Sequence, residues 1–129
     1  MTTANFSMLA AETYVSVTTF RTSGEPVSTP VWVVVDGDRL LVTTARSSGK
    51  VKRVRHTPRV EITPCDMRGN LSAGAVAVTA TASVRDDDAT LDAMDAALKK
   101  KYGAKYTAIR LAQKVRGTAG QSVALEIRL

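Results

Sequence analysis

Six short segments rich in β-branched residues follow one another along this chain, and most of them are bounded by residues that favour turns. Segments of this kind predict strands rather than helices. Ser23-Gly24 and Asp36-Gly37 separate the first three segments, and such pairs predict tight hairpin turns between antiparallel strands. The predicted strands are roughly Tyr14–Thr22, Val27–Val35, Arg39–Thr44, Val60–Pro64, Ala75–Arg85 and Ser122–Leu129.

The last two predicted strands also indicate which of their faces are buried. From Val123 to Leu129, apolar residues alternate with more polar ones, which predicts a strand with one buried face. In the strand before it, valines and alanines alternate with Thr79, Thr81 and Ser83. Small residues along a long strand allow another layer of the protein to approach closely.

Helical patterns are fewer. Leu91, Met94 and Leu98 recur at helical spacing, with three aspartates before them and three lysines and Gly103 after them. This order suits the helix dipole and a glycine C-terminal cap, so it predicts a helix. Further helices are predicted at Tyr106–Val115 and between Ser48 and His56, the latter with Ser47 or Ser48 as its N-cap and Pro58 as its stop.

The order of these elements predicts the fold class. Six strands joined mainly by hairpins do not form a βαβ alternation. The chain is therefore predicted to be mainly β, a six-stranded antiparallel barrel with peripheral helices. Its 129 residues suit one domain with a single core, so residues 1–129 are expected to form one domain.

Cysteine and histidine are too scarce to support most side-chain catalysis. Cys65 is the single cysteine, which excludes an internal disulfide and a multi-cysteine metal cluster. His56 is the single histidine, so a Ser-His-Asp triad and a histidine-rich metal site are poorly supported. Cys65 is interpreted as a packing residue and His56 as a surface residue. We expect no catalytic or metal-binding side chains, and any reaction then depends on a bound cofactor.

The sequence has no apolar run near the roughly 20 residues that a membrane span requires. Met1–Ala10 lacks the basic start and long apolar stretch of a secretory signal. The protein is therefore expected to be cytoplasmic and to have no membrane span.

Basic residues are concentrated in two parts of the chain. Lysines and arginines number 18 against 12 acids. The stretches Arg46–Arg59 and Lys99–Arg116 hold 13 of the 18 bases and contain no acid. This segregation favours an anionic partner, which could be a phosphorylated small molecule, a nucleic acid or an acidic membrane surface. The bases of the second stretch are interpreted by default as solvated helix faces.

Thr44–Arg53 is the segment most suited to binding an anion. It leaves a predicted strand and enters a short helix, whose first N–H groups are unpaired. The hydroxyls of Ser47 and Ser48, the backbone of Gly49 and the charges of Lys50 and Arg53 could close around a phosphate. The alternative interpretation is that Ser48 is only a helix cap and that the bases coat a solvated face.

The same segment carries a family resemblance. The pattern Thr44-x3-Ser48-x-Lys50-x2-Arg53, followed by Pro58-Arg59-Val60, resembles the split β-barrel flavoproteins of the pyridoxamine 5′-phosphate oxidase type. It is more similar to their actinobacterial branch, which uses the deazaflavin coenzyme F420. Pro26–Trp32, Asp36-Gly37-Asp38 and Val123–Leu129 fit the same branch, so the resemblance covers nearly the whole chain.

This resemblance implies an FMN-binding type of split barrel that forms a homodimer, with each cofactor in a groove between the subunits. It places the cofactor's phosphate against Ser48, Gly49, Lys50 and Arg53. It places the ring system along the strand that ends at Thr43 and Thr44. Trp32 is a candidate wall of the ring pocket, although a large aromatic is more often a core residue. A longer basic track would suit the anionic tail of F420, and Lys52, Arg55, Arg59 or Arg68 could supply it.

We therefore expect an F420-dependent oxidoreductase that transfers hydride between the deazaflavin and a small organic substrate. FMN is the alternative cofactor. A second hypothesis is a barrel that carries its cofactor, or binds heme or fatty acid, without turnover. Nucleic-acid binding ranks third and is not expected, because aromatics make up only 5% of the chain and do not interleave with the bases. Oxidation of pyridoxamine phosphate itself is not expected, because Ser122–Leu129 offers no counterpart to the residues that bind pyridoxal phosphate.

Overall fold

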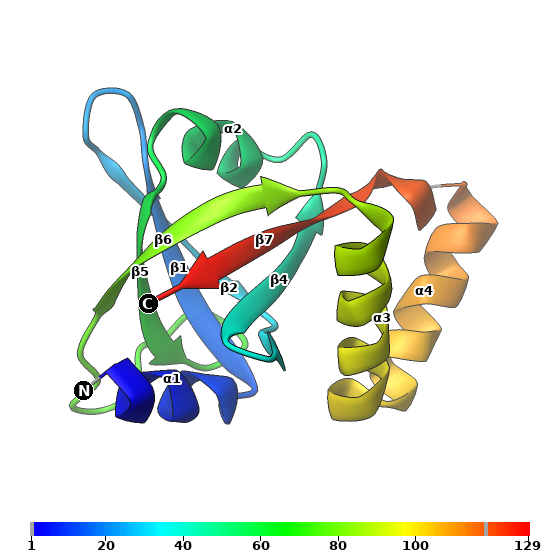
Figure 1. The fold of residues 1–129 in the computed structure, drawn as a ribbon, viewed down its shortest axis with the longest axis horizontal. Coiled ribbons are helices and arrows are strands. Elements are labelled where there is room, and N and C mark those ends of the chain that lie inside the picture. Colours follow the sequence, from blue (N-terminus) through cyan, green and yellow to red (C-terminus); the bar gives the residue numbers. More distant parts are fainter. Residues whose placement is uncertain (1, 118) are drawn as a thin grey trace.

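The computed structural model describes residues 2–117 and 119–129. It contains one antiparallel sheet of seven strands in the order β2-β1-β5-β6-β7-β4-β3, with helices around it (Figure 1). The strands are β1 Tyr14–Phe20, β2 Pro26–Val31, β3 Val34–Asp36, β4 Arg39–Ala45, β5 Arg59–Cys65, β6 Val78–Arg85 and β7 Ser122–Arg128. The helices are α1 Thr2–Ala10, α2 Gly49–His56, α3 Asp88–Tyr102 and α4 Ala104–Arg116, with a 3-10 turn at Ala119–Gln121.

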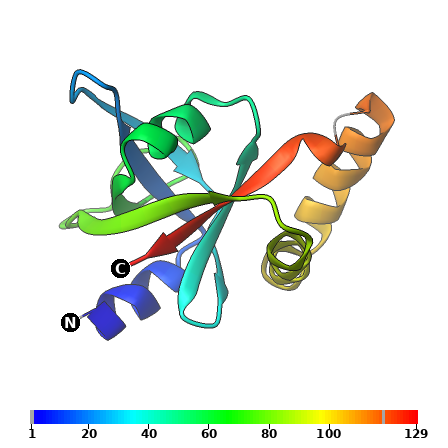
Figure 2. The same ribbon diagram turned by 45° about the horizontal axis from the view of Figure 1, so that its top comes forward.

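The fold class is confirmed, but the strand count differs from the predicted six. The predicted strand Val27–Val35 is two strands, β2 and β3, because the chain leaves the sheet at Trp32 and Val33. β2 pairs with β1 at one edge of the sheet, and β3 pairs with β4 at the other edge. The curved sheet is therefore linked through this crossing segment but is not closed by hydrogen bonds between its edges (Figure 2).

Both predicted hairpins are present. β1 and β2 are joined around Gly24, with φ 91°, and β3 and β4 around Gly37, with φ 62°. These dihedrals lie in the region that favours glycine, since other residues there carry a Cβ penalty. The two glycines therefore set the register of the strands on either side of them.

The main core lies on the concave side of the sheet. Buried residues there come from β1, β4, β5, β6 and β7, and include Val17, Val42, Ile62 and Leu125. Leu9 of α1 is fully buried against this core. No element was predicted before Tyr14, and α1 lies across one end of the sheet in Figure 1.

A second apolar cluster joins the convex side of the sheet to α3 and α4. It contains Val34 and Leu41 from the β3–β4 hairpin, Met94, Leu98 and Tyr106 from the helices, and Ala124 from β7. The middle of β7 is therefore buried on both faces, and the prediction of one buried face was wrong for this strand. Packing by α3 covers Ala124, while arginines from neighbouring strands surround Glu126.

The helix ends follow the residues that predicted them. The side chain of Ser48 caps α2, and that of Asp87 caps α3. Gly103 ends α3 with φ 58° and separates it from α4. Within the described residues, none of the helices has the length and hydropathy that crossing a membrane requires.

Candidate cofactor site

The turn from the end of β4 into the start of α2, residues Thr44–Arg53, is called the α2 turn. A short network of hydroxyl groups organises it. The Oγ of Ser48 accepts a hydrogen bond from the backbone N–H of Val51 at 3.4 Å, as an N-cap does. The hydroxyls of Ser48 and Thr44 lie 3.1 Å apart and are hydrogen-bonded. Thr44 is buried and Ser48 is partly exposed, so the network anchors the start of the helix to the end of the strand.

Arg53 turns back over the start of its own helix. Its Nε donates a 2.7 Å hydrogen bond to Oγ1 of Thr19, a buried residue on β1. Its guanidinium also lies over the backbone of Gly49, where a Cβ would be 2.5 Å from Nη1. The cation is thereby fixed beside the unpaired N–H groups of the first turn of α2, where an anion is favoured.

Lys50 lies next to this guanidinium and is partly buried. Burial and the nearby charge of Arg53 lower the pKa of the Lys50 ammonium below its ordinary value. Throughout residues 2–117 and 119–129, no carboxylate forms an ion pair with Lys50 or Arg53. The protein thus holds two neighbouring positive charges without compensating them itself.

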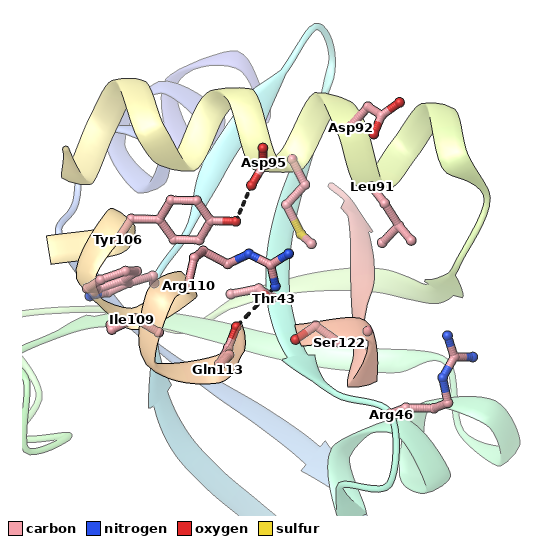
Figure 3. Close-up of a pocket in the computed structure, with 13 residues that line it drawn as sticks. Thr43, Arg46, Leu91, Asp92, Asp95, Tyr106, Ile109, Arg110, Gln113 and Ser122 are labelled. Atoms are coloured by element: carbon pink, nitrogen blue, oxygen red, sulfur yellow. Dashed lines mark hydrogen bonds between the residues drawn. The ribbon is translucent and has the colours of Figure 1, made fainter. Parts of the chain in front are cut away.

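The pleat of β4 separates Thr43 from Thr44. Thr44 faces α2, whereas Thr43 lines a cavity of about 340 Å³ between α3, α4 and the ends of β4 and β7 (Figure 3). The cavity is lined by Trp32, Thr43, Arg46, Leu91, Asp92, Met94, Asp95, Tyr106, Ile109, Arg110, Gln113, Gly120 and Ser122. It therefore takes in two of the candidate residues, Trp32 and Thr43, and excludes those of the α2 turn.

The polar side of this cavity comes from α3 and α4. Tyr106 donates a 2.5 Å hydrogen bond from its hydroxyl to Asp95, and Arg110 donates one to Gln113 at 3.0 Å (Figure 3). Burial, followed by the hydrogen bond to Asp95, raises the pKa of Tyr106. The same hydrogen bond holds the pKa of Asp95 below its usual range. The Tyr106 hydroxyl therefore remains a proton donor near neutral pH.

Sequence reasoning missed most of this cavity. The helical spacing of Tyr106 and Ile109 was taken to indicate packing only, and no role was predicted for Asp95. Their helical spacing did show that they share a face with Tyr102, but it could not show that this face leaves a space above Thr43. Arg46 was also missed; it borders the cavity and forms an ion pair with Asp86 at 3.2 Å.

Trp32 is both a packing residue and a cavity wall. Its ring stacks on that of Tyr102 with a centroid distance of 4.2 Å and an interplanar angle of 7°. It packs at the border of the second apolar cluster and also lines the cavity. The two interpretations of Trp32 that the sequence left open are therefore compatible.

Arg68 lies apart from the other candidates. It is exposed in the turn after β5, where its backbone N–H donates to Asp66 at 2.9 Å. Arg68 does not line the cavity and makes no described contact with the α2 turn. Within one chain, the structure does not bring it to the other candidate residues.

The remaining chemically distinctive residues have ordinary surroundings. His56 is exposed, and its Nδ1 lies 2.9 Å from the hydroxyl of Thr57. Cys65 is buried at the end of β5, and burial raises the pKa of its thiol. A thiol in such surroundings is a weak nucleophile.

The α2 turn fits the phosphate of a flavin-like cofactor on chemical grounds. It combines backbone donors at a helix start, two hydroxyls and two unpaired cations within one turn of helix. Arg46, two residues before Ser48, lines the cavity, so the turn and the cavity are neighbours along the chain. A ligand with a phosphate and a planar ring would therefore find complementary groups on both sides of the end of β4.

Comparison with known proteins agrees with the fold. Residues 1–129 match the family model described as pyridoxamine 5′-phosphate oxidase. The fold is similar to that of a solved F420 reductase, with 17% sequence identity, 95% of this chain and 90% of that chain covered, and a TM-score of 0.64. No curated protein gives a significant match to the sequence.

Two further solved structures share the fold. One is the heme storage protein HutZ from Vibrio cholerae, with 12% identity, 98% of this chain and 89% of that chain covered, and a TM-score of 0.66. The other is a NimC/NimA family protein from Clostridium acetobutylicum, with 14% identity, coverage of 98% and 81%, and a TM-score of 0.65. At these identities the similarity establishes the fold alone, because one fold hosts several functions.

Proposed function

The chain belongs to the pyridoxamine 5′-phosphate oxidase family, and on that basis we propose that it is an F420-dependent oxidoreductase acting on a small organic substrate. The phosphate of the cofactor binds at the α2 turn, against Ser48, Gly49, Lys50 and Arg53. Its ring passes the end of β4, beside Thr43 and Thr44, and reaches the α3–α4 cavity. FMN is the alternative cofactor for the same two sites.

One observation carries this proposal: the uncompensated positive charge of Lys50 and Arg53. Lys50 is partly buried, and Arg53 is fixed beside it by a hydrogen bond to Thr19. The two cations therefore repel one another in the free protein. A phosphate would replace that repulsion with charge-assisted hydrogen bonds. The α2 turn is therefore organised as expected of an anion site rather than of a solvated helix face.

The cavity supports the placement of the ring end. Its walls combine the aromatic ring of Trp32 and the apolar side chains of Leu91 and Met94 with a few polar groups. Sites for planar organic molecules have this composition, since apolar walls supply affinity and a few polar groups fix orientation. The hydroxyl of Tyr106 and the guanidinium of Arg110 are the groups that would orient a ring or a substrate there.

In this proposal the cofactor supplies the hydride chemistry when it is bound. The protein binds the phosphate at Lys50 and Arg53 and aligns the ring along β4. The walls of the cavity exclude water from the reacting face. The raised pKa of Tyr106 keeps the proton on its Oη, which lies at the wall of the cavity. No side chain is assigned a covalent role.

We also propose that the working unit is a homodimer, as the family resemblance implies. Exposed apolar side chains at the turn after β5 and before β6 support this, and Val76 is 75% exposed. Leu71 and Met67 are exposed in the same region. Sedimentation of the purified protein would give a dimer mass if the proposal holds, and a monomer mass with and without cofactor would contradict it.

The cofactor assignment is tested by fluorescence titration of the purified protein with F420, FMN, heme and a mixed-sequence oligonucleotide. We expect the tightest binding for F420. Tighter binding of FMN would transfer the proposal to the alternative cofactor. Tightest binding of heme, or salt-sensitive binding of the oligonucleotide alone, would overturn it in favour of a heme carrier or a nucleic-acid-binding protein.

The site is tested by charge reversal. Lys50→Glu and Arg53→Glu should each weaken F420 binding by about tenfold or more, the value expected for losing one charge-assisted hydrogen bond. Lys100→Glu and Lys105→Glu are matched controls on the second basic stretch, and both residues are exposed. Equal losses from the two pairs would indicate a general basic surface and contradict the site. Turnover of a candidate acceptor with reduced F420 then distinguishes an enzyme from a carrier.

A further inference from the structure

The break between β2 and β3 leaves a buried peptide without sheet partners. Val33 lies in the break and is fully buried. A buried N–H or C=O without a partner is costly, so such groups are nearly always hydrogen-bonded. At Val33 both partners come from the last two residues of α3, Lys101 and Tyr102.

The hydroxyl of Tyr102 links the break between β2 and β3 to the residue that precedes β1. It accepts a hydrogen bond from the backbone N–H of Val33 at 3.1 Å and donates to the carbonyl of Thr13 at 2.8 Å. The carbonyl of Val33 is a second acceptor at 3.1 Å. Burial raises the pKa of Tyr102 to about 12, so the hydroxyl keeps its proton throughout the physiological range.

Lys101 also binds the break between β2 and β3. Its Nζ donates to the carbonyls of Ala10, Glu12 and Val33 at 3.0, 2.5 and 2.7 Å. Although the residue is exposed as a whole, burial of its ammonium lowers its pKa. The interpretation of Lys99–Lys101 as a solvated face is therefore wrong for Lys101, which joins the end of α1 to the break in the sheet.

The same two residues determine where Trp32 lies. Val33, the residue after Trp32, is held by Tyr102 and Lys101, and the Tyr102 ring covers one face of the Trp32 indole at 4.2 Å. A parallel stack at this distance leaves no room for a ligand between the two rings. Trp32 lines the cavity and Tyr102 does not, so the indole presents its edge or its other face to the cavity.

We propose that Lys101 and Tyr102 are positioning residues that hold Trp32 as a fixed wall of the α3–α4 cavity and so determine how tightly a planar ring binds there. The inference rests on the proposed function for the identity of the bound ring. The holding of Trp32 by Lys101 and Tyr102 does not depend on that function. A pre-ordered wall increases affinity because the ligand does not have to order it on binding. A purely stabilising role would instead change the free energy of unfolding without changing the cavity.

Trp32 is the only tryptophan, so its fluorescence reports on this wall alone. The tests are Tyr102→Phe, which keeps the stacked ring and removes the hydroxyl, and Lys101→Met, which keeps most of the side chain and removes the charge. Lys100→Met is the matched control, since Lys100 is the exposed neighbour of Lys101 on the same helix. Acrylamide quenching is measured in the ligand-free proteins, and FMN and F420 affinities are measured by titration.

Both test variants are expected to raise the quenching constant of Trp32 at least about twofold and to weaken binding of the better cofactor by about five- to tenfold. Lys100→Met should match the wild type in both measurements. Titration with inorganic phosphate should give the same affinity in all four proteins, because the α2 turn is untouched. Unchanged quenching, or unchanged cofactor affinity, in a folded Tyr102→Phe or Lys101→Met would overturn the inference.

The two proposals fail in different ways. If Lys50→Glu and Arg53→Glu leave cofactor binding intact while Tyr102→Phe exposes Trp32 and weakens cofactor binding, the α2 site is wrong and the positioning role stands. If those charge variants abolish binding while Trp32 remains shielded in Tyr102→Phe, the α2 site stands and the positioning role is wrong. Should Tyr102→Phe not fold, Lys101→Met decides by the same measurements.

Discussion

Gly49 and Arg53, four residues apart on α2, lie so close that a Cβ on Gly49 would be 2.5 Å from Nη1 of Arg53. Gly49 is not in the positive-φ region, so its backbone would accept another residue. The absence of a side chain there is what allows the guanidinium to rest over the first turn of the helix. A substitution at Gly49 can therefore test the proposed binding role of α2 without destabilising the helix.

Gly49→Ala should therefore leave the fold intact and impair the anion site. The free energy of unfolding is expected to change by less than about 1 kcal/mol, because alanine suits a helix better than glycine. Affinity for inorganic phosphate should fall, because the new methyl group displaces the guanidinium. Titration calorimetry with phosphate measures this. The loss should disappear in an Arg53→Met background, and a loss of equal size there would show that Gly49 acts independently of Arg53.

Lys50→Met should increase stability in the absence of an anion while weakening phosphate binding. The pKa of Lys50 in the folded protein lies below its ordinary 10.5, so the folded state disfavours the ammonium. Between the folded and unfolded pKa values the unfolded chain binds more protons, and the stability of the wild type rises with pH in that window. Urea unfolding from pH 7 to 10.5 should show this rise reduced in Lys50→Met. Lys52→Met, at an exposed position on the same helix, should retain it.

Ser48→Ala should destabilise the protein by about 1 kcal/mol, the usual value for losing an N-cap side chain. The hydrogen bonds to Val51 and Thr44 are both lost in this variant. Chemical denaturation compares it with Ser47→Ala, at an adjacent exposed position that does not cap the helix. A similar loss from both substitutions would contradict the assignment of the cap.

Glu126→Gln should lower stability at neutral pH and flatten its dependence on pH in acid. The carboxylate is 9% exposed and accepts from Arg39 at 2.7 Å, and this hydrogen bond is the main reason that its pKa lies below 4.5. A depressed carboxyl pKa gives stability that is present above the unfolded value of about 4.3 and is lost as pH falls through the folded value.

The loss at neutral pH is expected to be about 1.5–3 kcal/mol, the usual range for a hydrogen bond to a charged group. Thermal unfolding between pH 2.5 and 7 measures both effects. Glu61→Gln is the comparison, because Glu61 forms a more exposed ion pair with Arg59. An acid limb of unchanged slope in Glu126→Gln would show that other carboxylates control acid unfolding.

Several parts of the fold could be predicted because they depend on neighbouring residues. Asp36-Gly37 indicated the hairpin, and Ser48 the start of α2, since turns and caps are made by residues a few positions apart. The prediction of an anion site at the α2 turn has the same local basis. Its hydroxyls, glycine and cations lie within ten consecutive residues.

The cavity could not be predicted in the same way. Its residues come from the β2–β3 break, β4 and the residue after it, α3, α4, the 3-10 turn and the start of β7. Trp32 and Tyr102 stack although they are far apart in the sequence, and no local pattern in either segment indicates the other. The hydrophobic spacing of α3 and α4 showed that they pack against something, but not that a space remains beside Thr43.

By itself, the sequence determined the hairpins, the helix ends and the charged turn at Lys50 and Arg53. Each depends on backbone preferences and hydrogen bonds over a few residues. Only the tertiary structure decided that Val27–Val35 divides into two strands at opposite edges of the sheet. It also decided that β7 is buried on both faces, that Lys101 is bound to backbone carbonyls, and that Thr43 faces a cavity. Those outcomes depend on which distant segments pack together, because a residue's burial and partners are set by its neighbours in space rather than in sequence.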